Sequence, residues 1–287
     1  MLPVELLLDG ITFGLILSLL GVGITLIFGL GEVLNLAHGE FVVICTILAL
    51  MFIGRGVDVT LSIVLSLVII GLIGIAFERL LLFPVYREKG EVRVLMGIFM
   101  TYGLSLAIHS YLVNTFPKVH FSVRVPYTEI VIGGLSIRPS TLLAAAIAAL
   151  ALIALGVFLK KTYIGKAIRT VAQNEVGAQL CGVNPASLRT LIFALGAVMA
   201  GLAGILYGLI ATVTATLGLD FTTFAIVVAI AGGVRSVYGA IVSGIILGIV
   251  HAFSSFFLGA SLSLVIFLIA VILIVLARPE GVLGEKG

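Results

Sequence analysis

Three polar residues, Asn35, His38 and Glu40, interrupt a long apolar stretch near the start of the chain and are its first candidates for chemistry. The glycines around them allow the backbone to turn sharply. Polar groups at such a break can bind a substrate or gate a path through a membrane. They can also serve only as caps for the two helices that meet there, with Asn35 as an N-cap. We therefore expect a helix break at these residues and leave both roles open.

A second polar break, GGVRSVYG at residues 232–239, lies in the last third of the chain. Gly232, Gly233 and Ser236 are its candidates for contact with a translocated substrate. Arg235 could pair with an acid at the membrane edge, but we expect it to lie in cytoplasmic water. Both breaks interrupt apolar runs that are too short to cross a membrane as ordinary helices. We therefore expect residues 35–40 and 232–239 to be non-helical and near a translocation path.

A third set of polar residues, Thr101, Tyr102 and Ser105, forms a predicted polar face on another apolar run. Such residues usually hold helices together, although a solute passing between the helices would also meet them. Thr101 and Tyr102 are therefore further candidates for the path. His109, farther along the same run, is expected to be an interfacial residue rather than a ligand.

No catalytic motif accompanies these residues. The sequence has no HExxH, GxSxG or Walker A pattern, and His38-Gly39-Glu40 has the wrong spacing for a zinc pair. No metal or cofactor is predicted, and nucleic-acid binding is not indicated because no basic patch is interleaved with aromatic residues. A transport protein without catalytic activity is expected. An intramembrane enzyme and a passive channel stay open as alternatives, and the composition favours the channel of the two.

The composition decides the class of protein. Of the 287 residues, 61% are hydrophobic and 10% are charged, and the mean hydropathy is +1.35. A soluble domain carries about 25% charged residues. The sequence therefore predicts an all-α polytopic protein embedded in the lipid bilayer, with one transmembrane domain over residues 1–287.

Nine apolar runs predict nine crossings, since a spanning helix needs about 20 apolar residues. The runs at 41–53 and 221–231 are short, and each is the second of four crossings. These sets predict two inverted repeats, about residues 6–113 and 190–278, with a linking span and a cytoplasmic segment between them at about 140–189. The loop at 114–138 could hold a small hairpin. The runs are 6–29, 41–53, 59–83, 94–113, 142–159, 191–211, 221–231, 240–257 and 262–277.

The longest polar interval, residues 160–189, is basic and lies between apolar runs, so it is expected on the cytoplasmic side. Ile164, Ile168 and Val171 recur in it at helical spacing with polar residues between them, which predicts a short amphipathic helix. Gly182 and Asn184-Pro185 are expected to end that helix. A helix on the cytoplasmic surface can receive force from another protein, but the interval could also be a plain connecting loop.

The distribution of basic residues predicts the orientation, with the N-terminus outside and the C-terminus in the cytoplasm. Only Arg55, Lys118, Arg124 and Arg138 fall outside in this threading. The other 12 of the 16 Lys and Arg residues fall on the cytoplasmic side: Arg79, Arg87, Lys89, Arg93, Lys160, Lys161, Lys166, Arg169, Arg189, Arg235, Arg278 and Lys286.

Several motifs in chain order resemble those of permease subunits of branched-chain amino acid ABC importers of the Liv type, especially the H-type subunit. The motifs cover essentially the whole chain. They are GLGEVLNLAHGEF (29–41), GKAIRTVAQNEVGAQLCGVN (165–184), FALGAVMAGLAGIL (193–206), AIAGGVRSVYGAIVSGIILG (229–248) and RPEGVLG (278–284). The family tends to have Gly and Pro in the second break, where this chain has Arg235 and Tyr238.

The resemblance implies a role in ATP-driven uptake of leucine, isoleucine and valine across a prokaryotic cell membrane. It implies a related M-type permease as heterodimer partner, two cytoplasmic ATPase subunits and an extracytoplasmic solute-binding protein. Relatives with similar breaks carry urea or short amides, which is the alternative substrate class. The implied fold is similar to that of importer permeases of the vitamin B12 and ribose type.

The same resemblance implies the residues that couple transport to ATP hydrolysis. The spacing Gly177-Ala178-x-x-x-Gly182 resembles a coupling-helix core, with its leading glutamate one place early, as Glu175. Small residues there would let a compact helix at 167–182 seat in a groove on an ATPase. A bulky residue at Ala178 or Gly182 is expected to leave the permease folded. The coupling candidates are Gly165, Ala167, Glu175, Gly177, Ala178 and Gly182.

Overall fold

The computed structural model describes residues 3–118, 120–123, 130–132 and 135–284, and these residues form a bundle of helices. The strands are β1 (His120–Phe121), β2 (Ile130–Ile132), β3 (Leu135–Ile137) and β4 (Val213–Thr214). The α-helices are α1 (Pro3–Gly31), α2 (His38–Gly54), α3 (Val59–Phe77), α4 (Gly90–Thr115), α5 (Pro139–Lys161), α6 (Tyr163–Gln173), α7 (Glu175–Leu180), α8 (Pro185–Ile210), α9 (Gly218–Gly232), α10 (Val237–Leu258) and α11 (Ala260–Ala277). A π-helical turn at Glu78–Leu82 extends α3, and 3₁₀ turns lie at Val85–Arg87 and Ala215–Leu217.

Length and apolar composition make eight of the described helical segments candidate membrane spans, and α2, with 17 residues, is a shorter apolar helix. Counted as an 18-residue span, α9 includes the 3₁₀ turn before it. The nine segments correspond to the nine predicted apolar runs and confirm the all-α polytopic class. The inverted repeat stays a prediction.

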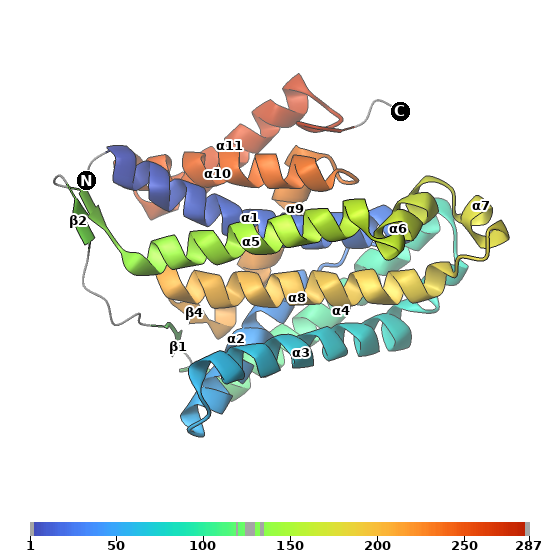
Figure 1. The fold of residues 1–287 in the computed structure, drawn as a ribbon, viewed down its shortest axis with the longest axis horizontal. Coiled ribbons are helices and arrows are strands. Elements are labelled where there is room, and N and C mark those ends of the chain that lie inside the picture. The colour runs from blue at the N-terminus through green and yellow to red at the C-terminus, as the bar shows by residue number, and fades with distance from the viewer. Residues whose placement is uncertain (1–2, 119, 124–129, 133–134, 285–287) are drawn as a thin grey trace.

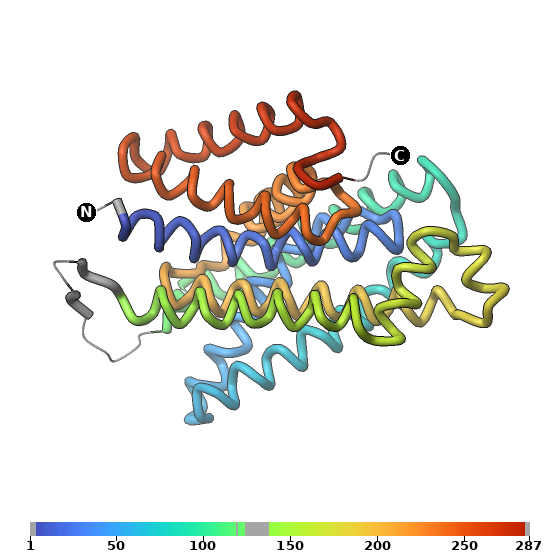
Figure 2. The backbone as a smooth tube through the Cα atoms, turned by 45° about the horizontal axis from the view of Figure 1, so that its top comes forward, coloured from blue at the N-terminus to red at the C-terminus, as the bar shows by residue number. Residues whose placement is uncertain are grey.

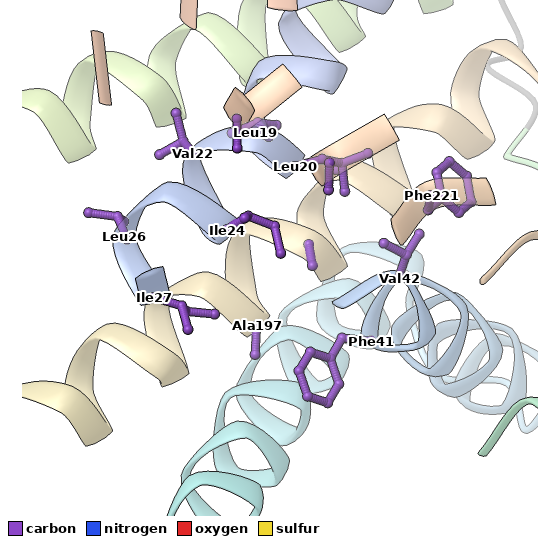
Figure 3. Close-up of a cluster of buried hydrophobic side chains, with 14 of the residues drawn as sticks. Leu19, Leu20, Val22, Ile24, Leu26, Ile27, Phe41, Val42, Ala197 and Phe221 are labelled. Atoms are coloured by element: carbon purple, nitrogen blue, oxygen red, sulfur yellow. The ribbon is translucent and has the colours of Figure 1, made fainter. Parts of the chain in front are cut away.

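Helix α1 is the central element of the bundle. Its sequence is apolar on every side, as expected of a helix surrounded by protein. It packs against α5, α8, α9 and α10, and Figure 1 shows it running through the middle of the molecule. Figure 3 shows α1 side chains such as Leu20 and Ile24 directed into the core, near Phe41 of α2 and Ala197 of α8.

Glycines allow α1 and α10 to approach backbone to backbone. A Cβ on Gly14 would lie 2.7 Å from the Cα of Ile245, so no larger residue fits at this crossing. The Ser18 hydroxyl lies 2.9 Å from the carbonyl oxygen of Ile241 and 2.7 Å from that of Gly14, and donates to these acceptors. Close approach at small residues, supported by a hydroxyl, is a common packing mode of helices in membranes.

The two ends of the bundle differ. Figure 1 and Figure 2 both show the start of α1 at the end where the loop between α4 and α5 lies, and α6 and α7 at the opposite end. The helix ends and loops that carry most of the Lys and Arg residues lie at the α6–α7 end. Which of the two ends faces the cytoplasm stays a prediction from the charge distribution.

The loop between α4 and α5 contains a small hairpin, as expected. Strands β2 and β3 pair antiparallel, with Ile132 opposite Leu135, and residues 133–134 between them lie outside the described residues. Strand β1 pairs instead with β4, so that Phe121 lies opposite Val213. Arg138, which precedes α5, forms an ion pair of 3.1 Å with Asp9 of α1. The loop is therefore attached to both halves of the chain.

Candidate functional site

The first break begins where α1 ends at Gly31, and residues 32–37 are not helical. Glu32 has a positive φ of 53°. The side-chain oxygen of Asn35 accepts a hydrogen bond of 3.1 Å from the backbone N–H of Ala37. It caps a local turn, and Ala37 is the N-cap residue of α2. The expectation that His38 and Glu40 are non-helical is wrong, because they lie in the first turn of α2.

Two threonines from other helices hold this break in place. The Thr101 hydroxyl of α4 accepts from the backbone N–H of Leu36 at 3.1 Å and lies 3.1 Å from the carbonyl oxygen of Leu34. The Thr222 hydroxyl of α9 accepts from the N–H of Gly39 at 2.9 Å. Because the first N–H groups of a helix have no partner within it, Thr222 satisfies one that would otherwise be buried and unpaired.

His38 is fully buried between α1, α2 and α8. A Cβ on Gly23 of α1 would lie 2.7 Å from its Nε2, so the imidazole occupies space that exists only because residue 23 is glycine. Neither ring nitrogen has a partner with hydrogen-bond geometry among the described residues, although the backbone of Leu20 lies close by. The ring is therefore held by packing against Gly23, with the backbone of Leu20 beside it.

Glu40 lies where the first turns of α2 and α9 meet. A Cβ added to Gly218 would collide with the Glu40 carboxylate, and one added to Gly39 would collide with the carbonyl oxygen of Gly218. Neither helix has a side-chain N-cap hydrogen bond. A helix N-terminus carries a partial positive charge. Two such ends therefore converge on a carboxylate that has no exposed surface.

His109 of α4 completes this cluster, and its Nδ1 lies 3.3 Å from Oε1 of Glu40. The distance is that of an ion pair, although the geometry does not satisfy that of a hydrogen bond. His109 was expected to be an interfacial residue rather than a ligand; its side chain is 23% exposed, and the packing of α2 against α4 also brings it to Glu40, which the sequence did not indicate. We call Asn35, His38, Glu40, Ser105 and His109 the polar cluster, meaning the buried polar residues at the first break and on the neighbouring face of α4. Of these, Glu40 and His109 are in contact, whereas the His38 ring points toward Gly23 of α1.

The polar cluster is unusual because so many of its buried atoms lack partners. Among the described residues, Asn35 Nδ2, both His38 nitrogens, both Glu40 oxygens, Ser105 Oγ and His109 Nδ1 have no hydrogen bond. Most buried polar groups in proteins are paired, and exceptions need an explanation. The unpaired atoms of Glu40 and His109 lie side by side, whereas those of His38 face Gly23 of α1.

Tyr102 does not belong to the polar cluster. It is 47% exposed, whereas its neighbour Thr101 is fully buried. Residues 101 and 105 share a helix face because they are four apart, and residue 102 points elsewhere. The predicted polar face is therefore split, with Thr101 and Ser105 inside the protein and Tyr102 on its surface.

The second break, residues 233–236, is shorter than expected, because Gly232 ends α9 and Val237 begins α10. Gly233 has a φ of +99°, which permits the sharp turn. The C-terminal segment closes over it: the N–H of Val282 donates to the carbonyl oxygen of Ala231 at 2.9 Å. Ser236 caps α10 by accepting from the N–H of Gly239 at 3.1 Å. Gly232, Gly233 and Ser236 thus have evident structural roles.

Arg235 in this turn forms an ion pair of 2.9 Å with Glu32, which also lies 3.5 Å from Arg93 at the start of α4. The expectation that Arg235 lies in water without a partner is wrong. Glu32 links the first break, the second break and α4 at the α6–α7 end of the bundle. The two breaks are therefore coupled electrostatically.

The segment between α5 and α8 consists of two helices, where one was expected. Thr162 caps α6, and the Asn174 side chain accepts from the N–H of Gly177 at 2.8 Å and starts α7. Asn174 itself has extended backbone angles, which break the predicted continuous helix. Gly182 has a φ of +82° and follows α7, as predicted for a helix end.

The coupling candidates divide by burial. Gly165 and Ala178 are buried, and a Cβ on Gly165 would collide with the carbonyl oxygen of Leu159. Ala178 packs inside this chain, so the assumption that its side chain is free to contact an ATPase is wrong, and a bulky residue there is expected to disturb the packing of α7. Gly182 has no neighbour within 4 Å of an added Cβ, but its positive φ strains any other residue. Ala167 is partly buried, and Gly177 lies against the Asn174 cap.

The exposed apolar residues of α6 and α7 were missed by the motif comparison. Val176 is 68% exposed and Leu180 is 86% exposed. Both belong to α7, which is not part of any candidate membrane span. Tyr163 is 89% exposed at the start of α6. We call Tyr163, Val176 and Leu180 the α6–α7 face. The sequence signal that could have identified them is the pair of apolar residues four apart, Val176 and Leu180, within a polar interval.

Glu175, the first residue of α7, connects this helix to the bundle through an ion pair of 3.0 Å with Arg189 of α8. The Arg189 guanidinium also lies over the ring of Tyr86, 4.7 Å from its centroid. Burial, reinforced by the negative charge of Glu78, raises the pKa of Tyr86 well above its usual value. Glu175 therefore anchors α7 to the membrane-embedded helices through Arg189.

The comparisons with known proteins agree with this architecture. A family model described as branched-chain amino acid transport system / permease component matches residues 6–277. The high-affinity branched-chain amino acid transport system permease protein LivH of Escherichia coli K12 is 29% identical, over 96% of this chain and 94% of LivH. The corresponding protein BraD of Pseudomonas aeruginosa is 26% identical, over 97% of this chain and 95% of BraD.

A solved structure, PsaBC from Streptococcus pneumoniae in complex with Fab, shares the fold with a TM-score of 0.54 at 13% identity, covering 95% of this chain and 91% of that one. The family predicted from the motifs is confirmed by the match over most of the chain. The chain belongs to the family of permease components of branched-chain amino acid transport systems, and it is a multi-pass membrane protein of the transporter class.

Proposed function

We propose that this chain is the permease subunit of an ATP-driven importer that carries leucine, isoleucine and valine. The observation that carries the proposal is the family match over residues 6–277, together with relatives named for high-affinity branched-chain amino acid transport. The urea, short-amide and channel alternatives have no comparable support. ATP hydrolysis belongs to partner subunits in this proposal.

The polar cluster is the part of the path that we propose meets the substrate. An amino acid carries an ammonium and a carboxylate, which complement the Glu40 side chain and the positive ends of the α2 and α9 helix dipoles beside it. Phe41, Val42 and Phe221 lie in the first turns of α2 and α9 and are buried (Figure 3), with Phe41 packed against Phe77 and Phe193. A branched aliphatic side chain suits such apolar surroundings.

The other candidates take supporting roles in this proposal. Asn35 and Thr101 hold the first break, and His38 fills the space beside Gly23, so these residues shape the path. Gly232, Gly233 and Ser236 shape the second break, which Arg235 joins to the first through Glu32. Tyr102 is on the surface and is proposed only as a residue at the edge of the path.

The two ends of the helix bundle differ, and we propose a different partner for each end. Two ATPase subunits would dock at the α6–α7 face in the cytoplasm, with Gly165, Ala167, Glu175, Gly177, Ala178 and Gly182 forming and supporting that segment. A solute-binding protein would dock at the opposite end, near the N-terminus of α1. An M-type permease would complete a heterodimer, and the N-terminus would lie outside the cell and the C-terminus in the cytoplasm.

The internal organisation that we propose is an inverted repeat. Helices α1 to α4 would form one unit and α8 to α11 the other, with α5, α6 and α7 between them. The support is that the short helices α2 and α9 hold the same position in each unit and that their first turns contact each other at Gly39 and Gly218. Contact at the repeat interface is where transporters of this kind bind substrate.

Reconstitution of the complete transporter tests the function. The chain, an M-type permease and two ATPase subunits would be placed in proteoliposomes with the solute-binding protein, and uptake of radiolabelled leucine would be measured with and without ATP. We expect uptake against a gradient that valine and isoleucine compete for and urea does not. Competition by urea or short amides would favour the alternative substrate class. Leucine flux by the chain alone at the full rate would establish a channel instead.

A further inference from the structure

We propose that the groove between α5 and α10 binds one anionic phospholipid, with its phosphate at Lys160 and Lys161. The groove has a volume of about 350 Å³ and lies on the outer surface of the bundle. It is independent of the polar cluster and of the α6–α7 face, and it does not depend on the transported substrate. Its lining residues are Leu15, Ala149, Leu152, Ile153, Gly156, Val157, Lys160, Lys161, Tyr238 and Ile241.

The wall on α5 is a single stripe along that helix. Its residues fall at positions 149, 152, 153, 156, 157, 160 and 161, the repeating spacing of one helix face. Five of them are apolar, and the last two are the lysines of the final helical turn. At 1.5 Å per residue the stripe extends for about 18 Å. An apolar strip that ends in two positive charges has the shape and polarity of a lipid with an anionic headgroup.

The floor and the opposite wall complete the site. Helix α1 contacts both α5 and α10 and contributes Leu15, while α10 contributes Ile241 and Tyr238. Figure 1 and Figure 2 show α1 lying between α5 and α10. Tyr238 is 57% exposed and lies at the same end as the two lysines, where its hydroxyl can donate to a phosphate oxygen.

The two lysines of the groove have no acidic partner in the part of the chain that the structure describes. Both side chains are exposed. Exposed Ile153 and Val157 beside them require an apolar partner at membrane depth. Basic pockets between spanning helices recognise anionic headgroups. One phospholipid meets both requirements at once.

Two pairs of variants separate this site from general effects. The variant Lys160→Gln/Lys161→Gln removes the headgroup charges, and Lys89→Gln/Lys166→Gln removes two exposed lysines from the same end of the bundle outside the groove. The variant Gly156→Leu fills the groove, and Gly103→Leu is its control on α4. A Cβ at either glycine has no neighbour within 4 Å, so both variants should fold.

The experiment titrates the purified full chain in detergent with phosphatidylglycerol or phosphatidylcholine and measures bound lipid by native mass spectrometry and the melting temperature by fluorescence. We expect one phosphatidylglycerol to bind preferentially and to raise the melting temperature. Because a lysine near a membrane surface contributes about 1 kcal/mol, Lys160→Gln/Lys161→Gln should weaken binding about thirtyfold. Gly156→Leu should abolish the single-lipid peak, while both controls should retain it.

Three results would overturn the proposal. Equal binding of phosphatidylcholine would show that the headgroup charge is not recognised. Equal loss in Lys89→Gln/Lys166→Gln would show a general effect of net charge. Stabilisation by soluble glycerol 3-phosphate that survives Gly156→Leu would show a site for small anions. The lysines also offset the helix dipole at the end of α5. Loss of that effect alone would lower the melting temperature of the lipid-free protein, while the rise in melting temperature on adding phosphatidylglycerol would stay the same.

Discussion

Nδ1 of His109 on α4 lies 3.3 Å from Oε1 of Glu40 on α2, inside the protein and 69 residues away along the chain. Glu40 is fully buried and His109 is 23% exposed in its side chain. In this pair the buried acid of the polar cluster meets an imidazole of α4. The contact joins the first break to α4. Its effect on transport and its effect on stability can be measured separately.

We expect Glu40→Gln and His109→Gln each to reduce leucine uptake by at least tenfold in proteoliposomes that contain the complete transporter. The double variant should lose stability by less than the sum of the two single losses, because the pair is coupled. A coupling free energy of about 1 kcal/mol or more is expected for residues in contact. Melting temperatures of the four proteins measure it. Additive losses would show that the two side chains do not interact.

Gly23→Ala should destabilise the chain, because a Cβ at residue 23 would lie 2.6 Å from Cε1 of His38. Overpacking typically costs about 1–3 kcal/mol. The double variant Gly23→Ala/His38→Ala replaces the imidazole by a methyl group, which removes the clash, so it should recover part of the lost stability. The control is Gly29→Ala on the same helix, where an added Cβ has no neighbour within 4 Å. Equal melting temperatures of Gly23→Ala and Gly29→Ala would contradict the packing described for His38.

The Glu32–Arg235 pair should matter for transport more than for stability. Arg235 is 63% exposed in its side chain, and pairs that are open to solvent contribute about 0.2–1 kcal/mol. Arg235→Gln is therefore expected to leave the melting temperature nearly unchanged while altering uptake, because the two breaks are no longer joined. The charge exchange Glu32→Arg/Arg235→Glu tests the contact itself. If the exchange restores no uptake, the role of Glu32 in transport would depend on its contact with Arg93 or on its backbone conformation and not on Arg235.

Val176→Asp and Leu180→Asp should prevent assembly with the ATPase subunits and leave the permease itself folded, because both side chains are exposed. Ala178→Leu is the contrasting variant, since Ala178 is fully buried and its enlargement should lower the melting temperature of the isolated chain. Co-purification of the ATPase measures assembly. Normal co-purification and ATP hydrolysis with both aspartates would place the docking surface elsewhere.

Cysteine labelling tests the proposed orientation. Asn174 and Ser122 are both exposed and belong to opposite ends of the bundle. Asn174→Cys should react with an impermeant maleimide only after the cells are opened, whereas Ser122→Cys should react in intact cells. The native Cys181 is exposed and must first be replaced by serine, and Cys45 is buried. Labelling of Asn174→Cys in intact cells would reverse the orientation.

The sequence by itself determined the class of protein and most of its helices. Twenty consecutive apolar residues are long enough to cross a membrane wherever they occur, so the runs of α1, α3, α5 and α8 were readable without any knowledge of their neighbours. The glycines and Asn184-Pro185 marked helix ends, because backbone conformation at such residues is a local property. The motifs in order also identified the family.

Only the tertiary structure decided which polar residues meet. Asn35, His38 and Glu40 were visible as a cluster, but His109, Thr222 and Arg235 join the breaks through contacts between residues distant in the chain. Apolar periodicity carries no information about such pairs, since nearly every face of these helices is apolar. For the same reason the burial of Ala178 and the exposure of Val176 could not be read from the motif. Both depend on how α7 packs against α8, where Glu175 meets Arg189.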